Sequence, residues 1–136
     1  MLSTLTISSL FVTDQDAALD FYVGTLGLEV RADVDLGFMR WLTVGVPGDA
    51  REVLLERPDG PAHDEATAGQ IRELLAKGGT GGNLFFQAED VDATYAAWVG
   101  AGVDITDEPT ERGYGKDFGA RDPFGNAIRV NQPAAG

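Results

Sequence analysis

Few side chains in this sequence are suited to covalent or metal chemistry. The chain has no cysteine and a single histidine, His63, so thiolate chemistry is excluded and no nucleophile–base pair is in view. Glu56 is a weak candidate for a general base, because no partner acid for it is evident. The glycine-rich run at residues 77–82 lacks the spacing of a phosphate-binding loop and precedes a predicted strand, so we interpret it as a linker.

The charge balance of the chain restricts its partners. Among 136 residues, 22 acidic and 10 basic side chains give a net charge of −12, which repels phosphate backbones and anionic lipid. We therefore expect neither nucleic acid nor a membrane as partner, and no apolar run reaches the roughly 18 residues of a membrane span. The N-terminal MLSTLTISSL has no leader features, so a cytoplasmic location is expected.

The first half of the chain predicts the element order βαβββ. A loosely alternating strand over Leu5–Val12 meets Thr13 and Asp14, either of which can cap a helix running through Tyr22. Gly24 and Gly27 close that helix. Three β-rich runs then follow, which are separated by turn residues: Leu28–Asp33, Phe38–Val46 and Glu52–Arg57.

The second half repeats this order. Asp14 aligns with Asp90 and Tyr22 with Trp98 at a constant offset of 76 residues, which indicates an internal duplication. Strands are predicted over Asn83–Ala88, Gly113–Arg121 and Asn126–Asn131, with a turn at residues 122–125. A helix over Asp64–Lys77, entered from a turn at residues 58–61, connects the halves. We expect one domain over 1–136, with modules at 4–58 and 83–133 and a connector at 59–82.

Three segments carry a resemblance to a known family. SLFVTDQDAALDFYVGTLGLEV at residues 9–30, RWLTV at 40–44 and DPFGNAIRV at 122–130 resemble the glyoxalase, bleomycin-resistance and extradiol-dioxygenase superfamily, also called vicinal oxygen chelate (VOC). The resemblance implies an α+β fold in which two tandem βαβββ modules form a curled mixed sheet around a shared cup. Because this scaffold carries many activities, function has to be argued from the site.

The resemblance also places the family's four metal positions on Ile7, Glu56, Asn83 and Arg129. Isoleucine has no lone pair and guanidinium is a permanent cation, so only Glu56 is a strong ligand. We therefore expect no metal and no other cofactor. Instead, Glu56 and Arg129 are predicted to pair across the cup; an anion-binding role for Arg129 is the equal alternative.

Strand alternation, with Ile7 facing the cup, predicts the residues that line it. Glu52 and Thr43 are expected to face the cup as well, and a closed cup in which Phe11 and Phe85 are core residues is the alternative. The predicted ligand-binding residues are Ser9, Phe11, Trp41, Glu56, Asn83, Phe85, Gln87, Arg129 and Asn131.

The leading hypothesis is a metal-free small-molecule-binding protein that resembles the bleomycin-resistance type. The ligand is expected to be planar or aromatic; the acidic residues favour a cation, whereas Arg129 favours an acid. The alternative is an enzyme of the glyoxalase I-like (lactoylglutathione lyase), isomerase or dioxygenase type that uses a divalent metal. A structural or regulatory dimer without ligand is the third possibility. By family analogy we expect a homodimer.

Overall fold

The computed structural model describes residues 1–59 and 61–135 and divides into two compact units, 1–80 and 81–136. Each unit contains one four-stranded mixed sheet, and the two sheets have equivalent strand orders, β1-β4-β3-β2 and β5-β8-β7-β6. The predicted fold class, α+β with two repeated βαβββ modules, is confirmed. The turn predicted at residues 58–61 includes residue 60, which lies outside the described residues. No helix in the described ranges is long and apolar enough to cross a membrane.

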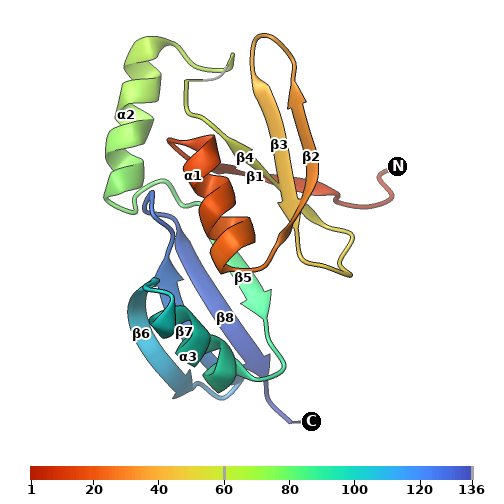
Figure 1. The fold of residues 1–136 in the computed structure, drawn as a ribbon, viewed down its shortest axis with the longest axis vertical. Coiled ribbons are helices and arrows are strands. Elements are labelled where there is room, and N and C mark those ends of the chain that lie inside the picture. Colours follow the sequence, from red (N-terminus) through yellow and green to blue (C-terminus); the bar gives the residue numbers. More distant parts are fainter. Residues whose placement is uncertain (60, 136) are drawn as a thin grey trace. The chain divides into compact units, whose positions relative to one another are not determined.

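Unit 1 follows the predicted order, with the connector helix at its end (Figure 1). A short helix continues directly into a π-helical turn, so the single predicted helix is two segments; in the second, the Leu26 amide donates to the Phe21 carbonyl five residues back. The elements are β1 (Ile7–Phe11), α1 (Gln15–Leu19), η1 (Asp20–Thr25), β2 (Glu29–Asp35), β3 (Arg40–Gly45), β4 (Glu52–Glu56) and α2 (Glu65–Ala76).

Unit 2 repeats the arrangement in a shorter form. Its helix lies against its own sheet (Figure 1), where Tyr95 and Trp98 meet Phe118 edge-on at ring-centroid distances of 5.4 and 5.3 Å. The elements are β5 (Asn83–Gln87), α3 (Val91–Gly100), β6 (Asp104–Glu111), β7 (Gly115–Arg121) and β8 (Ala127–Pro133).

Equivalent helix caps confirm the residue-by-residue alignment of the two units. The Asp14 carboxylate accepts from the Ala17 amide at 3.0 Å, and the Asp90 carboxylate accepts from the Ala93 amide at 3.1 Å. Beyond the helices, Gly27 and Gly102 both adopt the left-handed conformation, with φ of 84° and 81°. The predicted turn at residues 122–125 is also present and is organised by Asp122, whose Oδ1 accepts from three backbone amides at 2.9 Å.

Each sheet has one face turned toward its helix and one face turned away. In unit 1, Arg40 on β3 reaches Asp16 of α1 at 2.8 Å, so Leu42 shares the helix side while Trp41 and Thr43 point away. Strand alternation with Ile7 facing the cup places Ser8, Leu10 and Val12 on the helix side; Leu10 and Val12 are buried, whereas Ser8 is exposed. In unit 2, Phe118 marks the helix side. We call the face opposite α1 or α3 the lining face.

Candidate functional site

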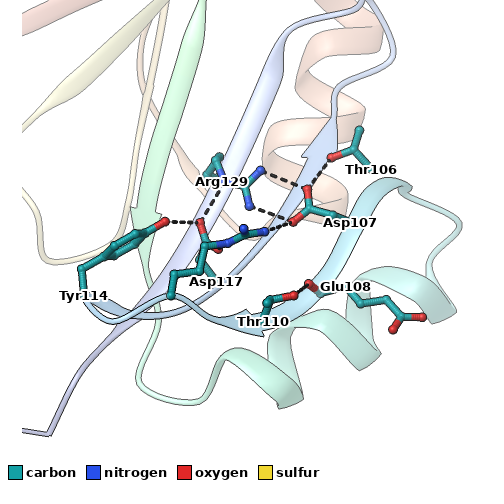
Figure 2. A network of polar contacts seen from close by, with 8 residues as sticks. Thr106, Asp107, Glu108, Thr110, Tyr114, Asp117 and Arg129 are labelled. Carbon is teal, nitrogen blue, oxygen red and sulfur yellow. Dashed lines mark hydrogen bonds and ion pairs between the residues drawn. The ribbon is translucent and has the colours of Figure 1, made fainter.

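The lining face of unit 2 carries a network of charged side chains centred on Arg129 (Figure 2). From β8, the Arg129 Nε donates to the Asp117 carboxylate on β7 at 2.8 Å. Its Nη1 and Nη2 donate to the two oxygens of Asp107 on β6 at 3.0 and 2.8 Å. The guanidinium therefore bridges two carboxylates of its own sheet, and one of the two contacts is the bidentate geometry that suits it best.

Gly119 opens the path that Arg129 takes to Asp107. Strand register places Asp107, Gly119, Arg129 and Phe85 in one row across β6, β7, β8 and β5. A side chain at the β7 position would stand between the two charged groups, and a Cβ built on Gly119 meets the Asp107 carboxylate, with the Arg129 Nη1 at 2.6 Å. Only glycine at this position leaves room for the ion pair.

Two further residues complete the network around Asp117. The Arg112 Nε donates to Asp117 at 2.6 Å and its Nη2 to Asp107 at 3.1 Å, and the Tyr114 hydroxyl donates to Asp117 at 3.1 Å. The Asp117 side chain is only 3% exposed, so its charge requires these partners. Two aspartates and two arginines leave the cluster with no net charge.

The titration behaviour of the cluster follows from these contacts. The hydrogen bond from Arg129 is the main cause that lowers the pKa of Asp117 to about 2; the bonds from Arg112 and Tyr114 lower it further, against the opposing effect of burial. The same guanidinium lowers the pKa of Asp107, and the pKa of Arg129 is raised in turn by both carboxylates. All three groups are ionised at neutral pH.

Within unit 2, the acids that bind Arg129 are Asp107 and Asp117, which lie in its own sheet. The expected pair with Glu56, a residue of unit 1, stays a prediction. Gly119 and the register across β7 bring the two aspartate carboxylates within 3.0 Å of the guanidinium, so two acids of the same sheet already neutralise the half-buried cation. Of the two roles left open for Arg129, the structural ion pair is the one that the geometry supports.

Gly119→Ala tests whether the gap at Gly119 is needed for the ion pair between Asp107 and Arg129. The added methyl group must displace the Asp107–Arg129 pair, and we expect a loss of about 1 to 3 kcal/mol in the free energy of unfolding, measured by urea denaturation. Gly100→Ala is the matched control, because its Cβ meets nothing within 4 Å and alanine favours a helix. Equal stability of the Gly119→Ala variant and the native protein would contradict the role of the gap.

The remaining predicted residues of unit 2 also lie on its lining face. Phe85 pairs with Arg129 and Gln87 with Asn131 in the parallel β5–β8 register. Asn83, Phe85 and Gln87 are exposed, and the Phe85 ring is 77% exposed. Phe85 is therefore not part of the core within its own unit, and the alternative of a closed cup stays a prediction. Among the residues that the structure describes, the buried Oδ1 atom of Asn131 has no hydrogen-bond partner, which leaves an acceptor unsatisfied beside this row.

The lining face of unit 1 brings together a second group of predicted residues. The β1–β4 register pairs Phe11 with Glu56 and Ser9 with Leu54. Trp41 is half-buried on β3. The Glu52 carboxylate is engaged within the sheet, because it accepts a hydrogen bond from the Thr43 hydroxyl at 2.7 Å. Thr43 itself is fully buried. That the two lining faces form one cup stays a prediction of the family resemblance.

The described residues of each unit form an open cleft. The first, of about 480 Å³, belongs to unit 1 and includes Glu56, with the β2–β3 hairpin on its other side. Its remaining lining residues are Gln15, Asp33, Asp35, Gly37, Phe38, Met39, Arg40, Arg57 and Asp59. The second, of about 500 Å³, belongs to unit 2 and is lined by Gln87, Ala88, Glu89, Gln132 and Pro133. Each cleft contains one predicted ligand-binding residue.

The residues at the family's four metal positions do not fit a divalent cation. Ile7 offers no donor atom, and Arg129 brings a positive charge that two carboxylates already bind. Within residues 1–59 and 61–135, no three histidine or acidic side chains converge as a ligand set. Glu56 and Asn83 alone supply too few donors for a transition-metal site.

Sequence reasoning missed the partners of Arg129. Asp107 and Arg112 lie in a segment that was assigned no role, and Tyr114 and Asp117 were treated only as parts of a predicted strand. A signal was present for Asp117: it directly precedes Phe118 in the middle of a predicted strand, and a carboxylate at such a position requires a cation. Arg129 on the adjacent predicted strand was the available cation.

Comparison with known proteins identifies the family. The model of the glyoxalase/bleomycin resistance protein/dioxygenase superfamily matches residues 4–130, and the chain belongs to this superfamily. The uncharacterized protein YurT of Bacillus subtilis (strain 168) is 34% identical over 130 residues, covering 94% of this chain and 98% of YurT.

Two solved structures resemble the whole chain. UcmS2 is 38% identical with a TM-score of 0.89, and the match covers 96% of this chain and 98% of UcmS2. TnmS3, an antibiotic binding protein from Streptomyces sp. CB03234, is 31% identical with a TM-score of 0.76, and the match covers 98% of both chains. The relatives of this chain within the superfamily therefore include an antibiotic-binding protein.

Proposed function

We propose that this protein binds a small aromatic ligand on its lining faces, in the manner of the antibiotic-binding members of its superfamily, without a metal ion or other cofactor. The similarity to TnmS3 over 98% of both chains supports the class of ligand. Each lining face supplies a suitable surface, because Phe85 lies on one strand with Asn83 and Gln87 in unit 2, and Phe11 is paired with Glu56 in unit 1. Aromatic surfaces with a few polar groups are typical of small-molecule sites.

The observation that carries the metal-free part of the proposal is the state of Arg129. The family resemblance places a metal-binding carboxylate at this position in metal-dependent members, whereas here the residue is a cation held by two aspartates. Moving this guanidinium away from its partners would break three charge-assisted hydrogen bonds and leave the buried Asp117 with only Arg112 and Tyr114, so displacement of Arg129 by a metal ion is unfavourable.

The same pairing supports an inference about the charge of the ligand. The positive charge of Arg129 is already neutralised by Asp107 and Asp117, so it offers little attraction to an anionic group. The chain as a whole carries a net charge of −12, which attracts cations and repels acids. We therefore infer that the preferred ligand is a neutral or cationic aromatic compound rather than an aromatic acid.

The family resemblance further suggests the assembly and the location. We propose a homodimer, the usual form of binding proteins in this superfamily, and a cytoplasmic location, which the absence of cysteine supports. Covering an exposed aromatic ring such as Phe85 with a ligand or a partner chain removes apolar surface from water, which favours binding.

A thermal-shift screen tests the proposed function. We expect neutral and cationic aromatic compounds to raise the midpoint of thermal unfolding in the presence of a chelator, because a ligand that binds only the folded state stabilises it. Matched aromatic carboxylates are expected to give smaller shifts.

The rival metal-dependent enzyme is tested on the same protein preparation. Nickel, zinc, manganese or iron is added, and hemithioacetal isomerisation is assayed. We expect no activity with any of the four metals. Isomerisation restored by any of them would refute the metal-free proposal, and thermal shifts confined to the carboxylates would refute the inferred ligand charge.

A further inference from the structure

The sole histidine of the chain lies against the lining face of unit 1. His63 precedes α2 in the connector, and its ring meets the Phe11 ring edge-on, with centroids 5.7 Å apart and an interplanar angle of 63°. Phe11 shares that face with Glu56, its partner in the β1–β4 register. His63 is half-buried, so part of the imidazole remains accessible at the margin of the aromatic surface.

One ring nitrogen of His63 is already committed. Its Nδ1 lies 2.8 Å from the Pro58 carbonyl oxygen. A carbonyl oxygen only accepts hydrogen bonds, so Nδ1 carries the proton and donates it. In the neutral imidazole the other nitrogen, Nε2, is therefore the unprotonated one and carries a lone pair. The backbone of the connector fixes both the tautomer and the orientation of the ring.

We propose that His63 is a ligand-recognition residue of this lining face, whose Nε2 accepts a hydrogen bond from a hydroxyl or phenol group on an aromatic ligand that packs against Phe11. This inference rests on the proposed function and deepens it, because it names the chemical group that the ligand presents. A fixed acceptor beside an aromatic ring recognises one kind of ligand: a planar compound with a donor at its edge. Compounds that lack the donor make no hydrogen bond with Nε2 and are expected to bind with lower affinity.

The first test concerns the tautomer and needs no ligand. Because His63 is the only histidine, a long-range nitrogen–proton NMR spectrum of the labelled protein shows a single imidazole. At a pH where the ring is neutral, we expect the proton on Nδ1. A proton on Nε2 would overturn the proposal, since that nitrogen would then be a donor.

The second test uses two matched probes, 2-naphthol and 2-methoxynaphthalene, which share the same ring system and differ in the donor. We expect 2-naphthol to bind the native protein more tightly than the ether. His63→Phe, which keeps an aromatic ring against Phe11, is expected to weaken 2-naphthol about fivefold and to leave the ether unchanged, as measured by calorimetry. On addition of 2-naphthol, the Nε2 signal of the native protein should shift.

The outcomes separate this inference from the proposed function. If both probes bind and His63→Phe changes neither affinity, the role of His63 is refuted while aromatic binding stands. If neither probe binds the native protein, aromatic recognition by this face fails and the inference fails with it. A His63→Gln variant, which keeps an acceptor atom in place of the ring, should retain part of the preference for 2-naphthol if the acceptor is what matters.

Discussion

Replacing Arg129 with methionine is expected to lower the free energy of unfolding by about 2 to 3 kcal/mol at pH 7. Methionine preserves much of the side-chain volume but removes both hydrogen-bonded ion pairs. Asp117, whose side chain is 3% exposed, then keeps only Arg112 and Tyr114 as partners. The exposure of Arg129 itself, 31% of the side chain, keeps the loss below that of a fully buried pair. Urea denaturation measures the difference.

The pH dependence of this loss has a definite sign. The folded-state pKa of Asp117 is about 2, below the ordinary value of about 3.9. The stabilisation that the lowered pKa represents is therefore present above about pH 4 and is lost as the pH falls toward 2. Since Arg129 is the main cause of the shift, the stability difference between the native protein and Arg129→Met should narrow between pH 4 and pH 2.

Arg51→Met is the matched control for this experiment. The Arg51 side chain is 80% exposed and lies 3.7 Å from Asp49, so its removal should change stability by less than about 0.5 kcal/mol. Two results would contradict a stabilising role for the cluster: a loss of unfolding free energy in Arg129→Met as small as that of the control, or a loss that is the same at pH 3 and pH 7. If ligands bound only through an acidic group, and this binding were lost in Arg129→Met, the anion-binding role of Arg129 would be supported instead.

Replacing Phe85 with alanine should have the largest effect on ligand binding. The ring is 77% exposed on the lining face, so its removal costs the folded protein little, whereas a ligand packed on it loses aromatic contact. We expect aromatic ligands from the thermal-shift screen to bind about tenfold more weakly, with the midpoint of thermal unfolding of the free protein nearly unchanged. Calorimetric titration gives the affinities.

Phe38→Ala is the control for Phe85→Ala. Phe38 is 69% exposed, but it belongs to the β2–β3 hairpin and lines the unit 1 cleft rather than the lining face of unit 2. Its removal should leave affinity unchanged within about twofold. A tenfold loss for Phe38→Ala with no loss for Phe85→Ala would move the binding site to the hairpin cleft and refute the lining-face account.

The fold was predictable because local signals and the duplication agree. Asp14 and Asp90 cap equivalent helices, and Gly27 and Gly102 end them with the same left-handed backbone. Each of these signals is short-range, and they recur in the second half at an offset of 76 residues for the caps and 75 residues for the glycines. The π-helical segment η1 gave no such signal, since the periodicity of Phe21 and Tyr22 fits an ordinary helix equally well.

The site was predictable in part, because strand alternation fixes which face a residue occupies but not which residue it meets. Phe85 and Arg129 were placed on one face correctly. The partner of Arg129 depends on the register across three strands and on the gap at Gly119, with shifts in the β6–β7 pairing at Ile105/Asp107 and Asp107/Thr110. Such shifts cannot be counted from sequence spacing. His63 was set aside as a connector residue because its contact with Phe11 is long-range.

One calorimetric titration distinguishes aromatic binding without a metal from binding through a metal. The strongest neutral or cationic aromatic ligand from the screen is titrated into the native protein, first with EDTA and then with added zinc or manganese. We predict the same Kd under both conditions. Binding that appears only when the divalent cation is present would contradict aromatic binding without a metal.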